Sequence, residues 1–396
     1  MKSLAIAFTN FGPYHLARLR ALAKALNARG DRLLAYEVAG TEARYPWLPK
    51  RGEEPFQSIT MFPGRTLEQL SRFECSRAMI SSLDQERPDA VAIVGYSRPE
   101  STAALDWATR RRVPAILMSE TQKIDHPRVW WKEAVKSRRV RKCSSALVGG
   151  PRHRDYLIEL GMPADRIALG YNAVDHSFFA EGAARIRHDS KSQAGLPARP
   201  YFLAVNRFVP EKNLLFLIRA FERYRQESPE NRAWDLVLSG DGPDRNRVEA
   251  AIAESSFSKS IHLPGFLQNE KLTCWLAHAS AFVHPSLMEP WGLVVNEAAS
   301  SGLPLIVSDR AGCVETFVPF PSGTTGLRVH PRDEESLAEA LSTIASLPES
   351  ERRAMGFRAQ KLAALWGPER FATGTLDALE LATEAPRRNR IKSLQG

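Results

Sequence analysis

Short apolar runs alternate with helix-length segments along most of the 396 residues, and this alternation limits the fold more than any other feature. In the first half of the chain the predicted strands are residues 4–8, 33–36, 90–94, 115–118 and 146–148. The predicted helices between and after them are residues 16–28, 67–86, 100–111, 129–142 and 152–160. Such alternation predicts a parallel sheet with helices on both faces.

The alternation is interrupted once and then resumes. Residues 181–200 carry Gly, Ala, Ser, Arg and two prolines without strong periodicity, so we interpret them as a linker. Further strands are predicted at 201–205, 236–239, 260–262, 281–284 and 304–307, with helices at 214–225, 245–254, 271–277, 292–301 and 334–344. We therefore predict an α/β fold of two doubly wound, Rossmann-like domains facing a central cleft.

The predicted domain limits are residues 1–180 and 201–366, followed by a helix at 367–384 and a basic tail at 385–396. Whether the last helix packs back on the N-terminal domain is left open. A hydrophobic fraction of 43% and a mean hydropathy of −0.30 are typical of globular proteins, and no apolar run is long enough to cross a membrane.

Charge and cysteine content indicate the partners and the compartment. The net charge of +9 favours anionic partners such as nucleotides, acidic membrane surfaces or nucleic acid. The four cysteines, Cys75, Cys143, Cys274 and Cys313, are scattered and form no CxxC pair. We expect buried free thiols in a reducing, cytoplasmic compartment.

The segment from Ser286 to Glu315 carries the strongest chemical signal. Glu289 lies in the loop between a predicted strand and a predicted helix, and Glu297 lies about two turns inside that helix. Gly292 stands where the first free N–H groups of the helix point outward, and such groups bind anions. Glu297 is too deep to share that anion and is better placed to accept hydrogen bonds from hydroxyls. A phosphate beside hydroxyls suggests a sugar nucleotide.

Three other loops that follow predicted strands support this interpretation. Arg207 and Lys212 come after residues 201–205 and supply a guanidinium and an ammonium for two phosphate groups. Residues 239–243 read Ser-Gly-Asp-Gly-Pro, and residues 263–267 read Leu-Pro-Gly-Phe-Leu.

Taken in order, these motifs resemble those of a known enzyme family. Arg-x4-Lys, Gly-Asp-Gly-Pro, Pro-Gly-Phe and Glu-Pro-Trp-Gly-Leu-x3-Glu-Ala are similar to the motifs of retaining glycosyltransferases of family 4, also called glycosyl transferases group 1, which have the GT-B fold. The strong motifs cover residues 201–315, and a weaker match extends over the N-terminal half.

The resemblance implies a role for each matching residue. Arg207 and Lys212 would hold the donor diphosphate and stabilise the charge of the departing nucleotide. Glu297 would accept from the ribose hydroxyls, and Glu289 would lie beside the donor sugar. The remaining donor-binding positions are the backbone N–H groups near Gly292, Leu293 and Val294, the turn at Gly240, and Leu267 near the base.

The resemblance also implies the reaction. A UDP-sugar or GDP-sugar would donate a sugar to a saccharide, a lipid-linked acceptor or a small molecule, with no further cofactor. Retention is thought to follow a front-face route in which the leaving phosphate helps deprotonate the acceptor, so positioning and charge suffice. No Asp-x-Asp stands near a predicted strand end, so we expect no essential divalent metal.

The N-terminal half departs from the family pattern. Its first loop keeps one glycine, Gly12, for close approach of a ligand to the backbone. Where many relatives carry a histidine, this chain has Glu120, and His126 follows six residues later. Either Glu120 has taken over a sugar contact, or His15 or His126 supplies it.

Each of these residues also has a simpler explanation. Arg207 and Lys212 could be ordinary exposed cations, and Glu289 could be a charge favoured by the helix dipole. The motif at Gly240 could be only a turn, and His15 could cap a helix. Two other functions stay open: a GT-B sugar-nucleotide epimerase, or a non-catalytic protein that binds anionic surfaces.

The run from Arg128 to Lys142 is basic, aromatic and compatible with a helix. We favour a surface helix with a basic outer face whose tryptophans pack inward. Peripheral contact with an anionic membrane, at its inner face, is the next interpretation. Nucleic acid is not expected, because no nucleic-acid motif accompanies the charge.

Overall fold

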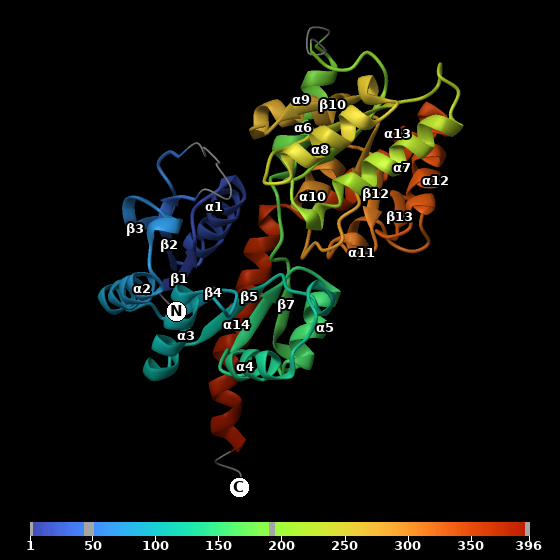
Figure 1. Ribbon diagram of the computed structural model, residues 1–396. Helices are drawn as coiled ribbons and strands as arrows, with labels where there is room; N and C mark the ends of the chain where they lie inside the picture. Colours follow the sequence, from blue (N-terminus) through green and yellow to red (C-terminus); the bar gives the residue numbers. More distant parts are fainter. Residues whose placement is uncertain (1–2, 43–50, 190–194, 393–396) are drawn as a thin grey trace. The chain divides into compact units, whose positions relative to one another are not determined.

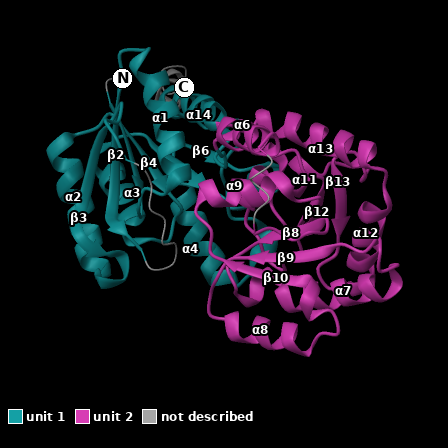
Figure 2. Ribbon diagram, turned by 90° about the horizontal axis from the view of Figure 1, so that it is seen from above, with its two compact units in different colours: residues 1–174, 368–396 teal, residues 175–367 magenta. Residues whose placement is uncertain are grey.

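The computed structural model describes residues 3–42, 51–189 and 195–392 (Figure 1). The chain forms two compact units (Figure 2). Unit 1 consists of Met1–Val174 together with Pro368–Gly396, and unit 2 consists of Asp175–Gly367.

Unit 1 is built on one parallel sheet. Within the described residues its strands are β1 (Ser3–Phe8), β2 (Arg32–Thr41), β3 (Gln57–Thr66), β4 (Ala90–Val94), β5 (Ala115–Ser119), β6 (Ser145–Val148) and β7 (Ile167–Leu169). Their order in the sheet is β3-β2-β1-β4-β5-β6-β7. Its helices are α1 (Pro13–Asn27), α2 (Arg72–Glu86), α3 (Pro99–Arg111), α4 (Trp130–Val140), α5 (Pro151–Glu159) and α14 (Pro368–Lys392).

Both faces of this sheet are covered, which explains the continuous apolar runs of its strands. In β1, Leu4, Ile6 and Phe8 pack into a core with α1 and α14, whereas Ala5 packs into a second core with α2, α3 and α5. Alternate residues of a strand point to opposite faces, so a central strand is apolar at nearly every position, with polar residues such as Ser3 at its ends.

Unit 2 has a second parallel sheet. Its described strands are β8 (Tyr201–Val205), β9 (Asp235–Ser239), β10 (Ile261–Gly265), β11 (Ala281–His284), β12 (Leu305–Ser308) and β13 (Gly326–Val329), in the order β10-β9-β8-β11-β12-β13. Its helices are α6 (His176–Arg187), α7 (Leu214–Glu227), α8 (Arg245–Glu254), α9 (Asn269–His278), α10 (Leu293–Ser300), α11 (Val314–Phe317), α12 (Glu334–Ser346) and α13 (Glu349–Ala364). The predicted α/β class with two doubly wound sheets is confirmed.

The last helix, α14, belongs to unit 1 and runs along its sheet (red in Figure 1). Ser145 in β6 donates a hydrogen bond of 2.5 Å to the carbonyl of Ala378. A side chain at Gly374 would come within 2.4 Å of the Leu169 carbonyl, so the helix lies directly on the sheet at this point. The helix continues to Lys392, past the expected end at residue 384, and residues 393–396 of the expected tail lie outside the described residues.

The predicted linker at 181–200 was wrong over its first part, because α6 runs through to Arg187. A Cβ atom at Gly182 would lie 2.9 Å from Thr273 in α9, and Arg187 donates to the carbonyl of Ala277. Phe179, the large buried residue of this helix, lies before the predicted linker, and the small residues inside it give no apolar periodicity of their own, so the helix was not recognised. Residues 190–194 of the predicted linker lie outside the described residues.

The tryptophans of α4 do not pack inward as we expected. Trp130 and Trp131 are 82% and 52% exposed, and the side chains that turn inward from α4 are mostly polar. None of the described helices is both long and apolar enough to span a membrane. The four cysteines are free, as expected; Cys274 is half-buried and the other three are buried.

Candidate functional site

In unit 2 the predicted site residues lie where the strand order reverses. β8 is the first strand of the sheet along the chain, with β9 on one side and β11 on the other. Ligands of doubly wound folds bind at such a switch point, beyond the carboxyl ends of the strands. Arg207 and Lys212 follow β8, whereas Glu289 and Gly292 follow β11. The topology therefore brings two distant parts of the sequence to the same sheet edge.

Glu289 is the centre of a buried polar cluster at this edge. Lys212 Nζ donates a short hydrogen bond to Glu289 Oε2. The same oxygen lies 2.7 Å from His284 Nε2, which in turn lies 3.1 Å from Ser286 Oγ. Glu289 is 8% exposed and His284 is fully buried. Because an ionised carboxylate only accepts hydrogen bonds, the Nε2 atom of His284 must carry a proton.

The charges of this cluster follow from its surroundings. Burial alone would raise the pKa of Glu289, but the Lys212 ammonium and the hydrogen bond from His284 outweigh it and lower that pKa to about 2. Burial lowers the pKa of His284, so its ring is neutral at neutral pH. Glu289 is thus a fixed anion paired with Lys212, and a second anion at this edge would compete with Glu289 for the ammonium.

The loop after β11 ends in a helix N-terminus. Gly292, with φ of +105°, is the N-cap of α10, and the helix begins at Leu293. Glu297 is four residues after Leu293 and therefore little more than one turn inside the helix, not the two turns that we expected. The side chain of Glu297 is 1% exposed. Leu293 and Val294 are the first helical residues, where backbone N–H groups have no acceptor within a helix.

The side chains of two residues directly after β8 have no hydrogen-bond or ion-pair partner among the described residues. The structure records no ion pair or side-chain hydrogen bond between the half-buried Arg207 and any other described residue. Asn206 is 6% exposed, and neither polar atom of its side chain has a hydrogen-bond partner among the described residues. Buried polar atoms of proteins are nearly always paired, so such atoms indicate a place for a ligand or an ordered water.

The glycines after β9 are required by packing. A Cβ atom at Gly240, where φ is +140°, would lie 1.7 Å from the carbonyl oxygen of Asn206, and one at Gly242 would lie 2.5 Å from that of Phe208. The turn after β9 thus lies directly against the loop that carries Arg207. The backbone N–H of Gly240 also donates a hydrogen bond of 2.9 Å to the carbonyl of Gly265. The half-buried Leu267 follows in the next loop. Contact of Gly240 or Leu267 with a ligand stays a prediction.

In unit 1, Gly12 and His15 form the start of α1. The backbone N–H of Gly12 donates to His15 Nδ1 at 3.2 Å, so the imidazole caps the helix. Burial, followed by the charge of Arg18, lowers the pKa of His15 to about 3. With Nδ1 accepting, the proton of the neutral ring is on Nε2. His15 can therefore donate a hydrogen bond to a ligand, but while the cap is in place it cannot serve as a general base.

Glu120 follows β5 and is exposed, with its Oε2 atom 3.0 Å from the amide of the buried Asn172. The charge of Arg18 interacts with both predicted groups: it contributes to the lowered pKa of His15, and Glu120 partly offsets the effect of burial, which lowers the pKa of Arg18. The Nε atom of Arg18 donates a hydrogen bond of 2.9 Å to the carbonyl of Ala173. The Arg18 guanidinium lies over the rings of Tyr171 and Phe371. His126, the other predicted alternative, is exposed next to a short turn of helix.

Several polar residues of these clusters were not predicted, among them Asn206, His284 and Arg18. His284 ends an apolar strand and Asn206 follows one, so their position at a strand terminus was the available signal. Arg18 lies four residues before Leu22 on the buried face of α1, and this spacing distinguishes it from the exposed Arg20. No three His, Cys, Asp or Glu side chains of the described chain are grouped as metal ligands would be.

Two family models match the chain. The model for Glycosyltransferase Family 4 matches residues 17–178, and the model for Glycosyl transferases group 1 matches residues 187–362. The two matches correspond closely to the two units, and the second contains all the motifs of residues 201–315.

Curated relatives are similar over part of their length. An alpha-D-kanosaminyltransferase of Streptomyces kanamyceticus is 28% identical over 59% of this chain and 58% of its own length. A glycogen synthase of Mycobacterium tuberculosis is 29% identical over 61% of this chain and 55% of its own length. The matched region therefore spans little more than half of these relatives.

Solved structures show the same fold over nearly the whole chain. HepE of Anabaena in complex with UDP has a TM-score of 0.72 at 16% identity, covering 96% of this chain and 100% of HepE. A sucrose-phosphate synthase of Thermosynechococcus elongatus has a TM-score of 0.70 at 19% identity, covering 100% of both chains. With the family matches, this likeness identifies the chain as a member of the group 1, family 4 glycosyltransferases, with the GT-B fold.

Proposed function

We propose that the chain transfers a sugar from a nucleoside-diphosphate sugar to a hydroxyl group of an acceptor, with retention at the anomeric carbon and without an essential metal. The observation that carries the proposal is the cluster at the carboxyl ends of β8 and β11, where Lys212 pairs with Glu289 beside Arg207 and the start of α10. UDP-sugars and GDP-sugars are the donors we expect, with no further cofactor. HepE, a structural neighbour, has been solved with UDP-glucose, which supports a nucleotide sugar.

In the proposed donor complex, the two cations of the site bind the diphosphate. Arg207 and Lys212 would contact the two phosphates, with the N–H groups of Leu293 and Val294 directed at the donor. Glu297, just over one turn inside α10, would accept from the ribose hydroxyls. As Lys212 turns to the phosphates, Glu289 becomes available to the hydroxyls of the donor sugar, while His284 still holds it in place.

The chemical step needs charge stabilisation more than a strong base. The bond between the anomeric carbon and the phosphate oxygen breaks, the acceptor oxygen bonds to that carbon, and the acceptor proton passes to the leaving phosphate. Negative charge grows on the diphosphate as the bond breaks, and fixed cations stabilise it. This front-face route accounts for retention without a carboxylate nucleophile.

The acceptor contacts are assigned to unit 1 by the same proposal. Gly12, the Nε2–H donor of His15, and Glu120 or His126 are the groups we expect to meet it. The acceptor is a saccharide, a lipid-linked sugar or a small molecule. A cytoplasmic location is also proposed, supported by the four free cysteines.

A transfer assay tests the proposal. The purified chain is incubated with a panel of nucleotide sugars, and release of nucleoside diphosphate is measured with and without candidate acceptors. We expect turnover of one donor class, and a loss of kcat/KM of about 10²–10³ in Lys212→Ala and in Glu297→Ala. The exposed Lys259→Ala and Glu254→Ala are matched controls and should keep full activity.

Each part of the proposal has a contrary outcome in this assay. Full activity in Lys212→Ala and Glu297→Ala would refute the site assignment, and loss of activity with a chelator would refute metal independence. Conversion of a sugar nucleotide to its epimer without acceptor would favour the epimerase instead. No turnover of any donor, with intact anion binding, would favour a non-catalytic protein.

A further inference from the structure

Apart from Val140 at its end, which is fully buried, the helix α4 of unit 1 has its apolar and polar sides reversed. Surface helices normally bury the apolar side and expose the polar one. In α4 the outward residues include Trp130, Trp131 and Val135, which are 82%, 52% and 46% exposed. Among the described residues no large hydrophobic side chain is more exposed than Trp130. Ile124, on the preceding turn, is 39% exposed.

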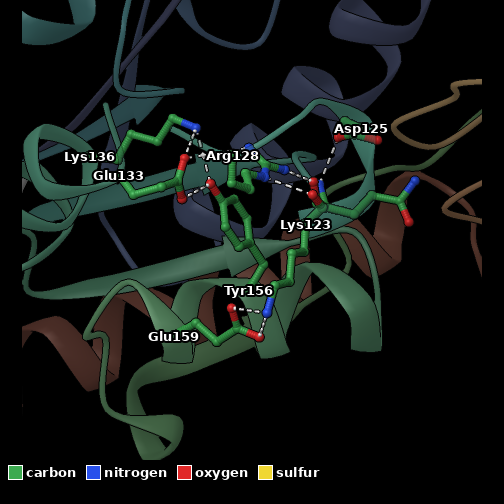
Figure 3. Close-up of polar contacts among 8 residues, drawn as sticks. Lys123, Asp125, Arg128, Glu133, Lys136, Tyr156 and Glu159 are labelled. Atoms are coloured by element: carbon green, nitrogen blue, oxygen red, sulfur yellow. Dashed lines mark hydrogen bonds and ion pairs between the residues drawn. The ribbon is translucent and has the colours of Figure 1, made fainter. Parts of the chain in front are cut away.

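The inward side of α4 is held by hydrogen bonds. Glu133 accepts from the Tyr156 hydroxyl at 2.7 Å and from Lys136 at 2.6 Å (Figure 3). Ser137 donates to the Leu160 carbonyl, and Arg139 donates to that of Tyr96. The inward polar groups thus have partners, and the fold of unit 1 fixes which side of the helix faces out.

The charge of this region is divided in the same way. Arg128 lies 4.4 Å over the ring of Tyr156 and 3.7 Å from Glu133 (Figure 3). Glu133 therefore forms ion pairs with two inward cations, Arg128 and Lys136. The outward Lys132 and Arg138 are exposed, and the described chain supplies no carboxylate partner for either. The outer face therefore combines tryptophans with unneutralised positive charge.

A pocket lies beneath the first tryptophan. Trp130, Ala134, Ser137, Tyr156 and Leu160 are among the residues that line this space of about 430 Å³ between α4 and α5. Trp130 therefore lines this space and is also largely exposed to solvent. A side chain so placed loses little packing when it is transferred to another apolar environment.

We propose that the outer face of α4, formed by Trp130, Trp131, Val135, Lys132 and Arg138, docks on the surface of an anionic lipid bilayer. Indole rings are stable at the boundary between lipid headgroups and acyl chains, and nearby Lys and Arg are attracted to anionic headgroups. Helices that lie in the plane of a membrane have the same combination of aromatic and basic residues. This docking does not depend on the proposed sugar transfer.

A nucleic acid is the less suitable occupant of this face. Arg and aromatic side chains also bind single strands, by base stacking and by contacts to phosphate. However, Val135, Ala134 and Ile124 share the exposed surface and offer nothing to bases or phosphates, whereas acyl chains would cover them. The apolar part of the face thus favours lipid.

Vesicle sedimentation tests the proposal with the full chain and no substrate. The vesicles consist of phosphatidylcholine alone or of phosphatidylcholine with phosphatidylglycerol. We expect binding to the anionic vesicles that falls as salt rises. The double variant Trp130→Ser/Trp131→Ser should bind on the order of tenfold less tightly, because it loses the apolar area. Lys132→Ala/Arg138→Ala should weaken binding about fivefold per residue.

A matched control is available in unit 2. Phe320 is 77% exposed and lies under the guanidinium of Arg328, so Phe320→Ser also removes an exposed aromatic ring beside a cation. This variant should bind the vesicles like the wild type, and all variants should keep the same circular dichroism and thermal midpoint. Absence of binding to anionic vesicles, or equal loss in Phe320→Ser, would overturn the proposal. So would binding to a single-stranded oligonucleotide, but not to vesicles, that the α4 variants abolish.

Discussion

Glu289 is the residue on which the polar contacts of unit 2 converge. Its carboxylate meets Lys212 from the loop after β8 and His284 from the end of β11. Lys212 and Glu289 were predicted because both lie in segments that follow apolar strands and match the ordered motifs of a known family. The sequence did not predict His284, because a histidine at the end of a buried strand looks like part of the core. Only the bend of the loop brings its ring to a carboxylate five residues later.

The lowered pKa of Glu289 predicts a pH dependence of stability. Its folded pKa is about 2 and its ordinary value is 4.5, so folding favours the ionised form. The stabilisation is complete above pH 4.5 and is lost as the pH falls toward 2. Glu289→Gln should therefore have a lower thermal midpoint than the wild type at neutral pH, and the difference should shrink through this acid range.

Calorimetry of both proteins across the range measures this difference. Glu254→Gln is the matched control, because Glu254 is exposed and no ion pair joins it to another described residue. Its midpoint should stay close to that of the wild type at every pH. A Glu289→Gln midpoint that differs from the wild type by the same amount at all pH values would show that the charge of Glu289 does not stabilise the fold.

At the scale of elements, the strands that the sequence did not predict are β3, β7 and β13. All three lie at sheet edges, where a strand pairs on one side only. β3 also contains Pro63 and Gly64, and six of its ten residues are only partly buried. Edge strands need no continuous apolar run, so the pattern that revealed the central strands is absent from them.

The sequence prediction failed for two helices, α6 and α4, whose buried side could not be inferred from their apolar periodicity. α6 buries Phe179, Gly182 and Ala183, and the two of these that lie in the predicted linker have too little apolar surface to mark a helical face. α4 has a clear amphipathic pattern, but its inner face is polar, so the pattern gave the wrong orientation for Trp130 and Trp131. In both helices the partner surface decides which side is buried, and that surface is distant in sequence.

The close contact between the turns after β8 and β9 predicts the effect of a single methyl group. A Cβ atom at Gly240 would overlap the carbonyl oxygen of Asn206, and φ there is +140°. Gly240→Ala should cost about 4 kcal/mol or more of unfolding free energy, at the upper end for single substitutions. Donor-dependent activity should fall with it, because the loop that carries Arg207 must shift.

The variant Gly323→Ala is the control that separates the steric clash expected at Gly240 from the backbone strain of a positive φ. Gly323 also has a positive φ of +108°, but a Cβ atom there would have nothing within 4 Å. This variant should cost only about 1–2 kcal/mol. Urea unfolding measures both values, and a Gly240→Ala variant no less stable than Gly323→Ala would contradict the packing described for this turn.

At the scale of the whole molecule, the sequence predicted the architecture well. Both sheets have the same order over their first six strands, in which the first strand lies in the middle. Buried parallel strands are apolar over most of their length, and the helices between them are long enough to be recognised. The return of the chain to unit 1 through α14 was left open, because the packing partners of that helix are distant in sequence.

The central claim is that the edge of unit 2 after β8 and β11 holds a nucleoside diphosphate. Isothermal titration calorimetry of UDP and GDP, compared with uridine and guanosine, tests it most directly. The wild type should bind one of the diphosphates more tightly than the matching nucleoside. Lys212→Ala and Arg207→Ala should each weaken diphosphate binding about tenfold to a hundredfold and leave nucleoside binding unchanged. Equal affinity for diphosphate and nucleoside, or undiminished diphosphate binding in both variants, would contradict the claim.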